Sequence, residues 1–156
     1  MDYFKSYGIE VGQGKYFDEA FYGVAILYNL LYNEIFSYLD QYDLTPAKFN
    51  ILITIKNQGK DKGINQVELS KRLIVSPSNM TRMLDRLERE KLVVRTAQED
   101  DRRVKVIKIT ERGIKLIDTV WAGYQKCLNK ISAQLKDGDV KMLAEGAKKW
   151  VAQLAN

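Results

Sequence analysis

A run of hydrogen-bonding side chains lies in the middle of the chain, between residues 76 and 86. It consists of short polar residues and arginines: Ser76, Ser78, Asn79, Thr81, Arg82 and Arg86. Ser78 and Arg82 are four residues apart and share one face of a helix, which Arg86 extends by another turn. Groups of these types hydrogen-bond to phosphates and to base edges. The other face is apolar and consists of Met80, Leu84 and Leu87. The pattern indicates a helix that binds with one side and packs with the other.

The composition argues against catalysis. The chain has 156 residues, no histidine and one cysteine, Cys127. This removes the commonest general base near neutral pH, the nucleophile pairs that contain histidine, and nearly all zinc sites. Carboxylates such as Asp100 and Asp101 border a basic segment with no evident pocket. We therefore expect no enzyme, no metal site and no cofactor, and a reducing compartment suits the single thiol.

The positive charge is concentrated in the middle third of the sequence. The net charge is +5, and residues 60–112 hold 14 Lys or Arg against 9 Asp or Glu, whereas the remainder holds 11 of each sign. A neutral body with a basic segment is typical of a nucleic-acid-binding module. Charge alone leaves open a solvated basic face without a partner.

The sequence also indicates the cellular compartment of the protein. The N-terminus has neither an apolar signal-peptide core nor a twin-arginine motif. The most apolar window, residues 24–32, is far shorter than the roughly 20 residues that cross a bilayer. We expect a cytoplasmic protein without a membrane span.

Hydrophobic periodicity predicts helices over residues 18–41, 46–59, 65–74, 77–91, 110–135 and 140–154. The expected N-caps are Asp18, Thr45, Asn65, Ser76 and Thr110. Asn65 and Glu68 have capping-box-like spacing. Asp137 and Gly138 are expected to break the chain between the last two helices. The first helix carries two apolar stripes, so we expect it to be buried on more than one side.

Two of these helices are short and only a few residues apart, which is typical of a helix-turn-helix. After Leu92, apolar residues change from helical spacing to alternation with polar residues, at residues 93–96 and 104–109. A polar tip lies between these two segments. This pattern predicts a β-hairpin. The fold class is therefore mainly α with a small β-wing: a winged helix-turn-helix flanked by long helices.

The sequence resembles the MarR family of winged-helix transcriptional regulators over residues 18–155. The resemblance is carried by residues 66–88 (QVELSKRLIVSPSNMTRMLDRLE), by Leu92-Val93, by Asp101-Arg102-Arg103 and by residues 109–113 (ITERG). The combination is specific, whereas any one piece would be weak.

The resemblance implies a homodimeric, sequence-specific DNA-binding regulator, usually a repressor. Residues 1–17 would form an N-terminal arm, residues 45–112 the DNA-binding domain, and residues 18–44 and 113–156 the helical dimerisation region. Two recognition helices would then meet successive major grooves of a pseudo-palindromic operator, roughly 34 to 36 Å apart.

The resemblance also implies the contacts to double-stranded DNA: Ser76, Ser78, Asn79, Thr81, Arg82 and Arg86 from the helix, and Arg102, Arg103 and Lys105 from the hairpin. In the family the arginine of Asp-x-Arg lies in the minor groove while the aspartate steadies the tip, and Arg103 and Asp101 match these positions. Three alternatives stay open: Ser76 as a cap alone, Arg82 and Arg86 paired with nearby carboxylates, and a solvated tip without a partner.

Members of the family commonly respond to small aromatic or anionic effectors. Tyr28, Tyr32, Phe49 and Trp121 are candidates for an effector pocket, although aromatic residues at helical spacing are also typical of a core. We expect Cys127 to be an inert packing residue in or beside a helix interface. The alternative function is a winged-helix module that binds a partner protein with the same exposed helix and has no operator of its own.

The wing provides the first prediction. A narrow minor groove concentrates negative potential, so an arginine held there senses groove width as well as charge. Arg103→Ala should lower operator affinity markedly and leave the dimer and its thermal stability nearly unchanged. A gel-shift or anisotropy titration measures the first effect, and unchanged affinity would remove the wing from the mechanism.

Overall fold

The computed structural model describes residues 3–10, 12, 14, 16–59, 62–97 and 105–155. Its helices are α1 (Tyr3–Ser6), α2 (Tyr16–Leu39), α3 (Pro46–Thr54), α4 (Gln66–Arg72), α5 (Pro77–Arg89), α6 (Glu111–Ser132) and α7 (Asp137–Leu154). Its strands are β1 (Ile64–Asn65), β2 (Val93–Ala97) and β3 (Lys105–Ile109). A 3-10 turn follows α2 at Asp40–Tyr42, and a π-helical turn follows α3 at Ile55–Gly59. The expected wing-tip residues Asp101, Arg102 and Arg103 lie outside the described residues.

Two helices begin at the residues that the sequence predicts. The Thr45 hydroxyl accepts a hydrogen bond from the Lys48 amide at 3.2 Å, and the Thr110 hydroxyl accepts one from the Gly113 amide at 3.1 Å. Each bond satisfies an N–H that has no partner within its helix. Both caps are therefore confirmed.

The start of α4 is confirmed in part. Asn65 Oδ1 accepts a hydrogen bond from the Val67 amide at 2.8 Å, as expected of an N-cap. Glu68 does not reach back toward Asn65. Its carboxylate pairs with Arg72 at 2.7 Å, one turn further along the same face. The i, i+4 ion pair replaces the expected capping box.

Two other boundaries differ from expectation. α2 begins at Tyr16, so Asp18 lies inside the first turn and is not the N-cap. α7 begins at Asp137, so Asp137 and Gly138 start this helix, and the break lies at residues 133–136. Acidic residues stabilise the first turn of a helix through its dipole, which accounts for both aspartates.

The wing is an antiparallel sheet with strand order β1-β3-β2. Val93 pairs with Ile109 and Ala97 pairs with Lys105, which confirms the predicted hairpin. β1 was not predicted, because two residues are too few to display an alternating pattern. Gly63, before β1, has φ +79°, and a Cβ there would lie 2.9 Å from the Ile107 carbonyl oxygen. Only glycine fits this close approach of two backbones.

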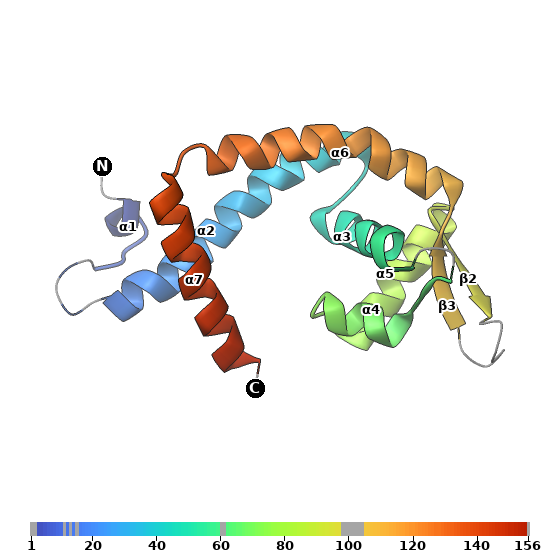
Figure 1. The fold of residues 1–156 in the computed structure, drawn as a ribbon, viewed down its shortest axis with the longest axis horizontal. Coiled ribbons are helices and arrows are strands. Elements are labelled where there is room, and N and C mark those ends of the chain that lie inside the picture. The colour runs from blue at the N-terminus through green and yellow to red at the C-terminus, as the bar shows by residue number, and fades with distance from the viewer. Residues whose placement is uncertain are drawn as a thin grey trace.

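α3, α4, α5 and the sheet form one lobe, and α2 and α6 run side by side away from it (Figure 1). The core lies in this lobe, where apolar side chains of α3, α4, α5 and the sheet meet the end of α2 and the first half of α6. Its fully buried members include Leu39, Phe49, Ile51, Leu52, Leu69, Met80, Leu84, Leu87, Ile107, Ile117 and Val120.

A glycine lets α6 approach the lobe closely. A Cβ at Gly113 would collide with the Leu92 carbonyl oxygen and would lie 2.7 Å from Ile109 Cγ1. The same carbonyl accepts a hydrogen bond from the Thr110 amide at 3.0 Å. The start of α6, the end of β3 and the segment that follows α5 therefore meet at the Leu92 carbonyl.

A second close contact joins α2 to α6. The Tyr38 hydroxyl donates a hydrogen bond to the Val120 carbonyl oxygen at 2.8 Å, and it passes over Gly123, where a Cβ would overlap the ring. Burial, together with the neighbouring Tyr42, raises the pKa of Tyr38 to about 12. The hydroxyl therefore stays protonated and keeps its donor role. Further along, Lys130 pairs with Glu34 at 3.3 Å.

The long helix α2 differs most from expectation. It was predicted to be buried on more than one side, but Leu39 is its single buried residue within the protomer. Tyr16, Phe17 and Tyr28 are 70%, 74% and 64% exposed. The N-terminal half of α2 extends beyond the lobe, so one copy of the chain has little with which to cover it. Among the described helices, none is long and apolar enough to span a membrane.

The contact at Gly113 yields a stability prediction. Gly113→Ala should destabilise the protein by about 2 kcal/mol, because the added methyl group meets backbone that cannot move without disturbing the hairpin. Gly138→Ala is the control, since nothing lies within 4 Å of a Cβ built there. Chemical denaturation measures both. Equal stability of the two variants would contradict the close approach.

Candidate nucleic-acid interface

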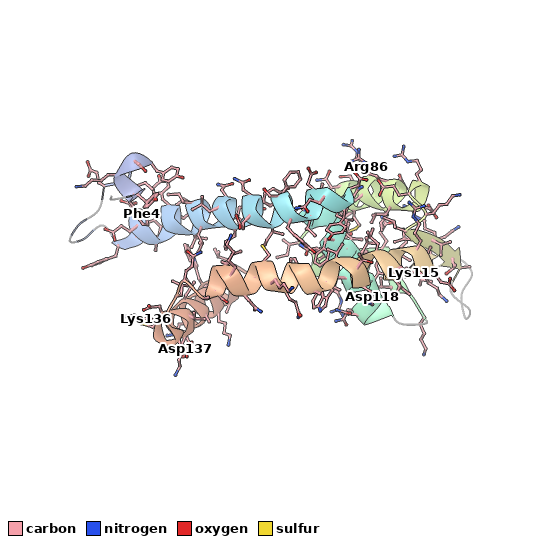
Figure 2. All side chains as sticks on the ribbon, turned by 90° about the horizontal axis from the view of Figure 1, so that it is seen from above. Phe4, Arg86, Lys115, Asp118, Lys136 and Asp137 are labelled. Carbon is pink, nitrogen blue, oxygen red and sulfur yellow. The ribbon has the colours of Figure 1, made fainter. Side chains whose placement is uncertain are left out.

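The outer face of α5 carries the predicted polar run. Each of its members is exposed: Ser76, Ser78, Asn79, Thr81, Arg82 and Arg86. On the inner face Met80, Leu84 and Leu87 are fully buried. In Figure 2 the labelled Arg86 extends outward from α5. The amphipathic spacing read from the sequence is confirmed.

Ser76 occupies the N-cap position but does not act as a cap. Its backbone is extended, and its hydroxyl makes no hydrogen bond to the first-turn amides. Instead, Ser76 Oγ lies 3.4 Å from Ser78 Oγ. Capping therefore does not account for this serine. Ser76 is exposed at the N-terminus of α5, where the helix dipole and the first-turn amides favour an anion.

The acidic residues of α5 are held by a cation from the wing. Arg95 of β2 donates from Nη2 to Asp85 at 2.6 Å and from Nη1 to Glu88, and its backbone amide donates to Glu88 at 3.1 Å. Burial disfavours the charged form of Arg95, but the hydrogen bonds to Asp85 and Glu88 outweigh it and raise the pKa. The ion pairs also hold β2 against α5.

The acid at the end of α5 has another partner. Glu90 pairs with Lys48 of α3 at 2.7 Å, and the same ammonium donates to the Asp43 carbonyl oxygen at 3.2 Å. With Asp85, Glu88 and Glu90 thus engaged, Arg82 and Arg86 have no ion pair among the described residues. Internal pairing of these arginines, the alternative raised by the sequence, is not what the structure contains.

The same face includes an arginine that the sequence reading missed. Arg89 is exposed, and its Nε donates to the Asp85 carbonyl oxygen at 3.3 Å. It lies seven residues after Arg82, so two helical turns place both on one side. That spacing was visible in the sequence and could have identified it. Lys105, at the start of β3, is exposed as well.

The four aromatic pocket candidates separate in the structure. Tyr28 and Tyr32 line a cleft of about 310 Å³ between α2 and the lobe. Residues of α3 and Met83 of α5 form its wall on the side of the lobe. Phe49 is 2% exposed and stacks on Trp121 with ring centres 6.4 Å apart. Phe49 is therefore a core residue, which is the alternative that the helical spacing of these aromatic residues left open.

Cys127 lies half-buried on α6, beside the interface with α2. Burial raises the pKa of its thiol, Glu34 raises it further, and Lys130 opposes both. The reactive thiolate is therefore disfavoured at neutral pH. Among the described residues, no cluster of three or more His, Cys, Asp or Glu side chains could hold a metal ion.

Comparison with known proteins identifies this architecture. Residues 44–105 match the model of the MarR family. This chain carries a MarR-family winged helix-turn-helix domain. It is 25% identical over 122 residues to the transcriptional regulator MhqR of Bacillus subtilis, covering 78% of this chain and 82% of MhqR. It is 29% identical over 118 residues to the transcriptional repressor MdtR of the same organism, covering 76% and 74%.

Solved structures extend the MarR likeness beyond the matched residues. A mutant of MarR from E. coli, complexed with operator DNA, superposes with a TM-score of 0.79 at 25% identity, covering 90% of this chain and 99% of that one. CouR from Rhodococcus jostii, bound to p-coumaroyl-CoA, superposes at 0.75 with 23% identity, covering 88% and 94%. The winged-helix fold and the mainly helical class are thereby confirmed.

Proposed function

We propose that this chain is a homodimeric, sequence-specific DNA-binding repressor of a pseudo-palindromic operator. The observation that carries the proposal is the outer face of α5, where exposed Arg82 and Arg86 have no ion pair within the described part of the chain, while Arg95 and Lys48 hold the neighbouring acids. An α-helix fits the major groove, and a guanidinium can bond a guanine bidentately. The operator-bound MarR structure supports this use of the fold.

Within this proposal, residues 45–112 are the DNA-binding domain. The proposed contacts are Ser76, Ser78, Asn79, Thr81, Arg82 and Arg86 from the recognition helix, and Arg102, Arg103 and Lys105 from the wing, with Asp101 positioning the tip. The two serine hydroxyls and the first-turn amides of α5 suit phosphate, and the arginines suit phosphate or base edges.

Dimerisation is proposed for residues 18–44 and 113–156. α2 and α7 line a cleft of about 860 Å³ whose walls are almost entirely apolar, among them Phe21, Leu27, Leu143, Trp150 and Leu154. An apolar surface of this extent in one protomer is a common mark of an interface. A second copy would bury it and, by symmetry, set two recognition helices one DNA turn apart.

The arm of residues 1–17 is proposed to join this dimer region. Phe4 lies against α2, where a Cβ at Gly23 would approach its ring to 3.2 Å. The Gly12 amide donates to Glu19 at 2.8 Å, so the arm is attached to α2 at two points.

A small effector is proposed to release the operator. The cleft that holds Tyr28 and Tyr32 connects α2 to Met83 of α5, and the side chains around it are uncharged. An aromatic ring suits such walls better than an isolated anion does. CouR, whose structure contains p-coumaroyl-CoA, supports an aromatic ligand class.

Arg82→Ala tests the DNA-binding function. Loss of a guanine contact should cost about 1 to 3 kcal/mol and relax the preference at one base pair of each half-site. Anisotropy titrations over a series of salt concentrations should give a steep negative slope for the unaltered protein. The control is Lys148→Ala on α7, which should leave operator affinity unchanged. A salt-independent interaction would instead favour the protein-binding module.

Leu143→Glu tests the dimer. A charge in the apolar cleft should dissociate the dimer and weaken operator binding, while the lobe keeps its helical circular dichroism. Ala144→Glu is the matched control, because Ala144 adjoins Leu143 on α7 but does not line the cleft. Sedimentation velocity measures the assembly. An unaltered protein that is monomeric at every concentration would overturn the proposed dimer.

A further inference from the structure

One side-chain hydrogen bond joins the two helices of the helix-turn-helix on its outer surface. Gln66, the first residue of α4, donates from Nε2 to Thr81 Oγ1 of α5 at 2.7 Å. The Thr81 hydroxyl in turn donates to the Pro77 carbonyl oxygen at 3.0 Å. Gln66 is half-buried and Thr81 is exposed. The bond therefore lies at the edge of the proposed DNA-binding face.

This bond changes what Thr81 can offer a ligand. A hydroxyl has one hydrogen, and here it is committed to Pro77. One of the oxygen's acceptor positions is filled by Gln66. Thr81 is exposed and has no donor left, so its methyl is the other group that it can offer a ligand. The sequence alone suggested a polar contact at this position.

The same bond fixes the amide of Gln66. One of its two N–H groups is used on Thr81, which leaves the second N–H and the carbonyl oxygen without a partner among the described residues. The backbone of Gln66 is held as well, because the Ser70 hydroxyl donates to its carbonyl oxygen at 2.9 Å. A donor and an acceptor are thereby held side by side on a fixed plane.

A fixed donor–acceptor pair next to a methyl group has a complement in the major groove. Adenine presents the N7 acceptor beside the N6 donor, and thymine presents its C5-methyl group. A phosphate needs donors only, so it makes no use of the amide oxygen.

We propose that Gln66 is a specificity-determining residue that reads an adenine, while Thr81 contacts a thymine methyl on the same or the adjacent A·T pair. The inference rests on the proposed operator binding and adds to it a residue of α4 and a preferred base pair.

The test uses chemical substitutions in operator DNA selected from a random pool by the full-length protein. Replacing single adenines by 7-deazaadenine removes the N7 acceptor, and replacing single thymines by uracil removes the methyl group. We expect one 7-deazaadenine position per half-site to weaken binding at least about fivefold. One uracil on the same or the adjacent pair should weaken it about threefold.

Three variants separate the two contacts. Gln66→Ala should abolish the 7-deazaadenine effect. Thr81→Ser keeps the hydroxyl and loses the methyl, so it should abolish the uracil effect alone. Thr81→Val keeps a methyl and releases the amide, so it should reduce the 7-deazaadenine effect and retain the uracil effect. Gln125→Ala, at an exposed glutamine of α6, should reproduce both effects of the unaltered protein.

The outcomes distinguish this inference from the proposed function. If the unaltered protein selects no DNA, the operator proposal fails and the inference fails with it. If it binds an operator but no such base position exists, or if Gln66→Ala weakens every sequence equally, the inference alone is overturned. Thr81→Ser preserves the hydrogen bond to Gln66 and so keeps the test valid should Gln66→Ala prove unstable.

Discussion

The ion pairs between Arg95 and two carboxylates of α5 determine which charges the outer face of that helix presents. Left to themselves, Asp85 and Glu88 would pair with arginines of their own helix or repel an approaching polyanion. Arg95 approaches them from β2, and the cost of its partial burial is outweighed by its hydrogen bonds. The result is a face with hydroxyls and with exposed guanidinium groups that none of the described acids pairs, backed by the buried apolar side chains of Met80, Leu84 and Leu87.

Two glycines allow close contacts of the long helices, one with backbone and one with a tyrosine ring. Gly113 lets the start of α6 rest against the Leu92 carbonyl, and Gly123 lets Tyr38 reach the Val120 carbonyl. Neither contact tolerates a side chain. The contact at Gly113 holds the start of α6 against the lobe, and the contact at Gly123 holds α2 against α6.

The long helices also explain a difference between pattern and structure. Periodicity reports that a helix face is apolar, but it does not report what covers that face. The two stripes of α2 read as burial on more than one side, yet much of this surface is exposed in the protomer and borders the cleft with α7. A second copy of the chain would bury this same apolar surface. The surface therefore accounts both for the two stripes in the sequence and for the proposed dimer.

What the sequence by itself determined about this protein is local. Thr45 and Thr110 cap helices, the apolar stripe of α5 packs inward, and residues 93–97 pair with residues 105–109, because each of these signals depends on residues close to one another in the sequence. The tertiary structure decided the rest. In the folded chain β1 pairs with β3, and the Ser76 hydroxyl does not cap α5. Asp85 and Glu88 form ion pairs with Arg95, and Gln66 forms a hydrogen bond with Thr81. Each of these depends on which groups compete for one partner, and that competition is settled only when elements from different parts of the chain are packed together.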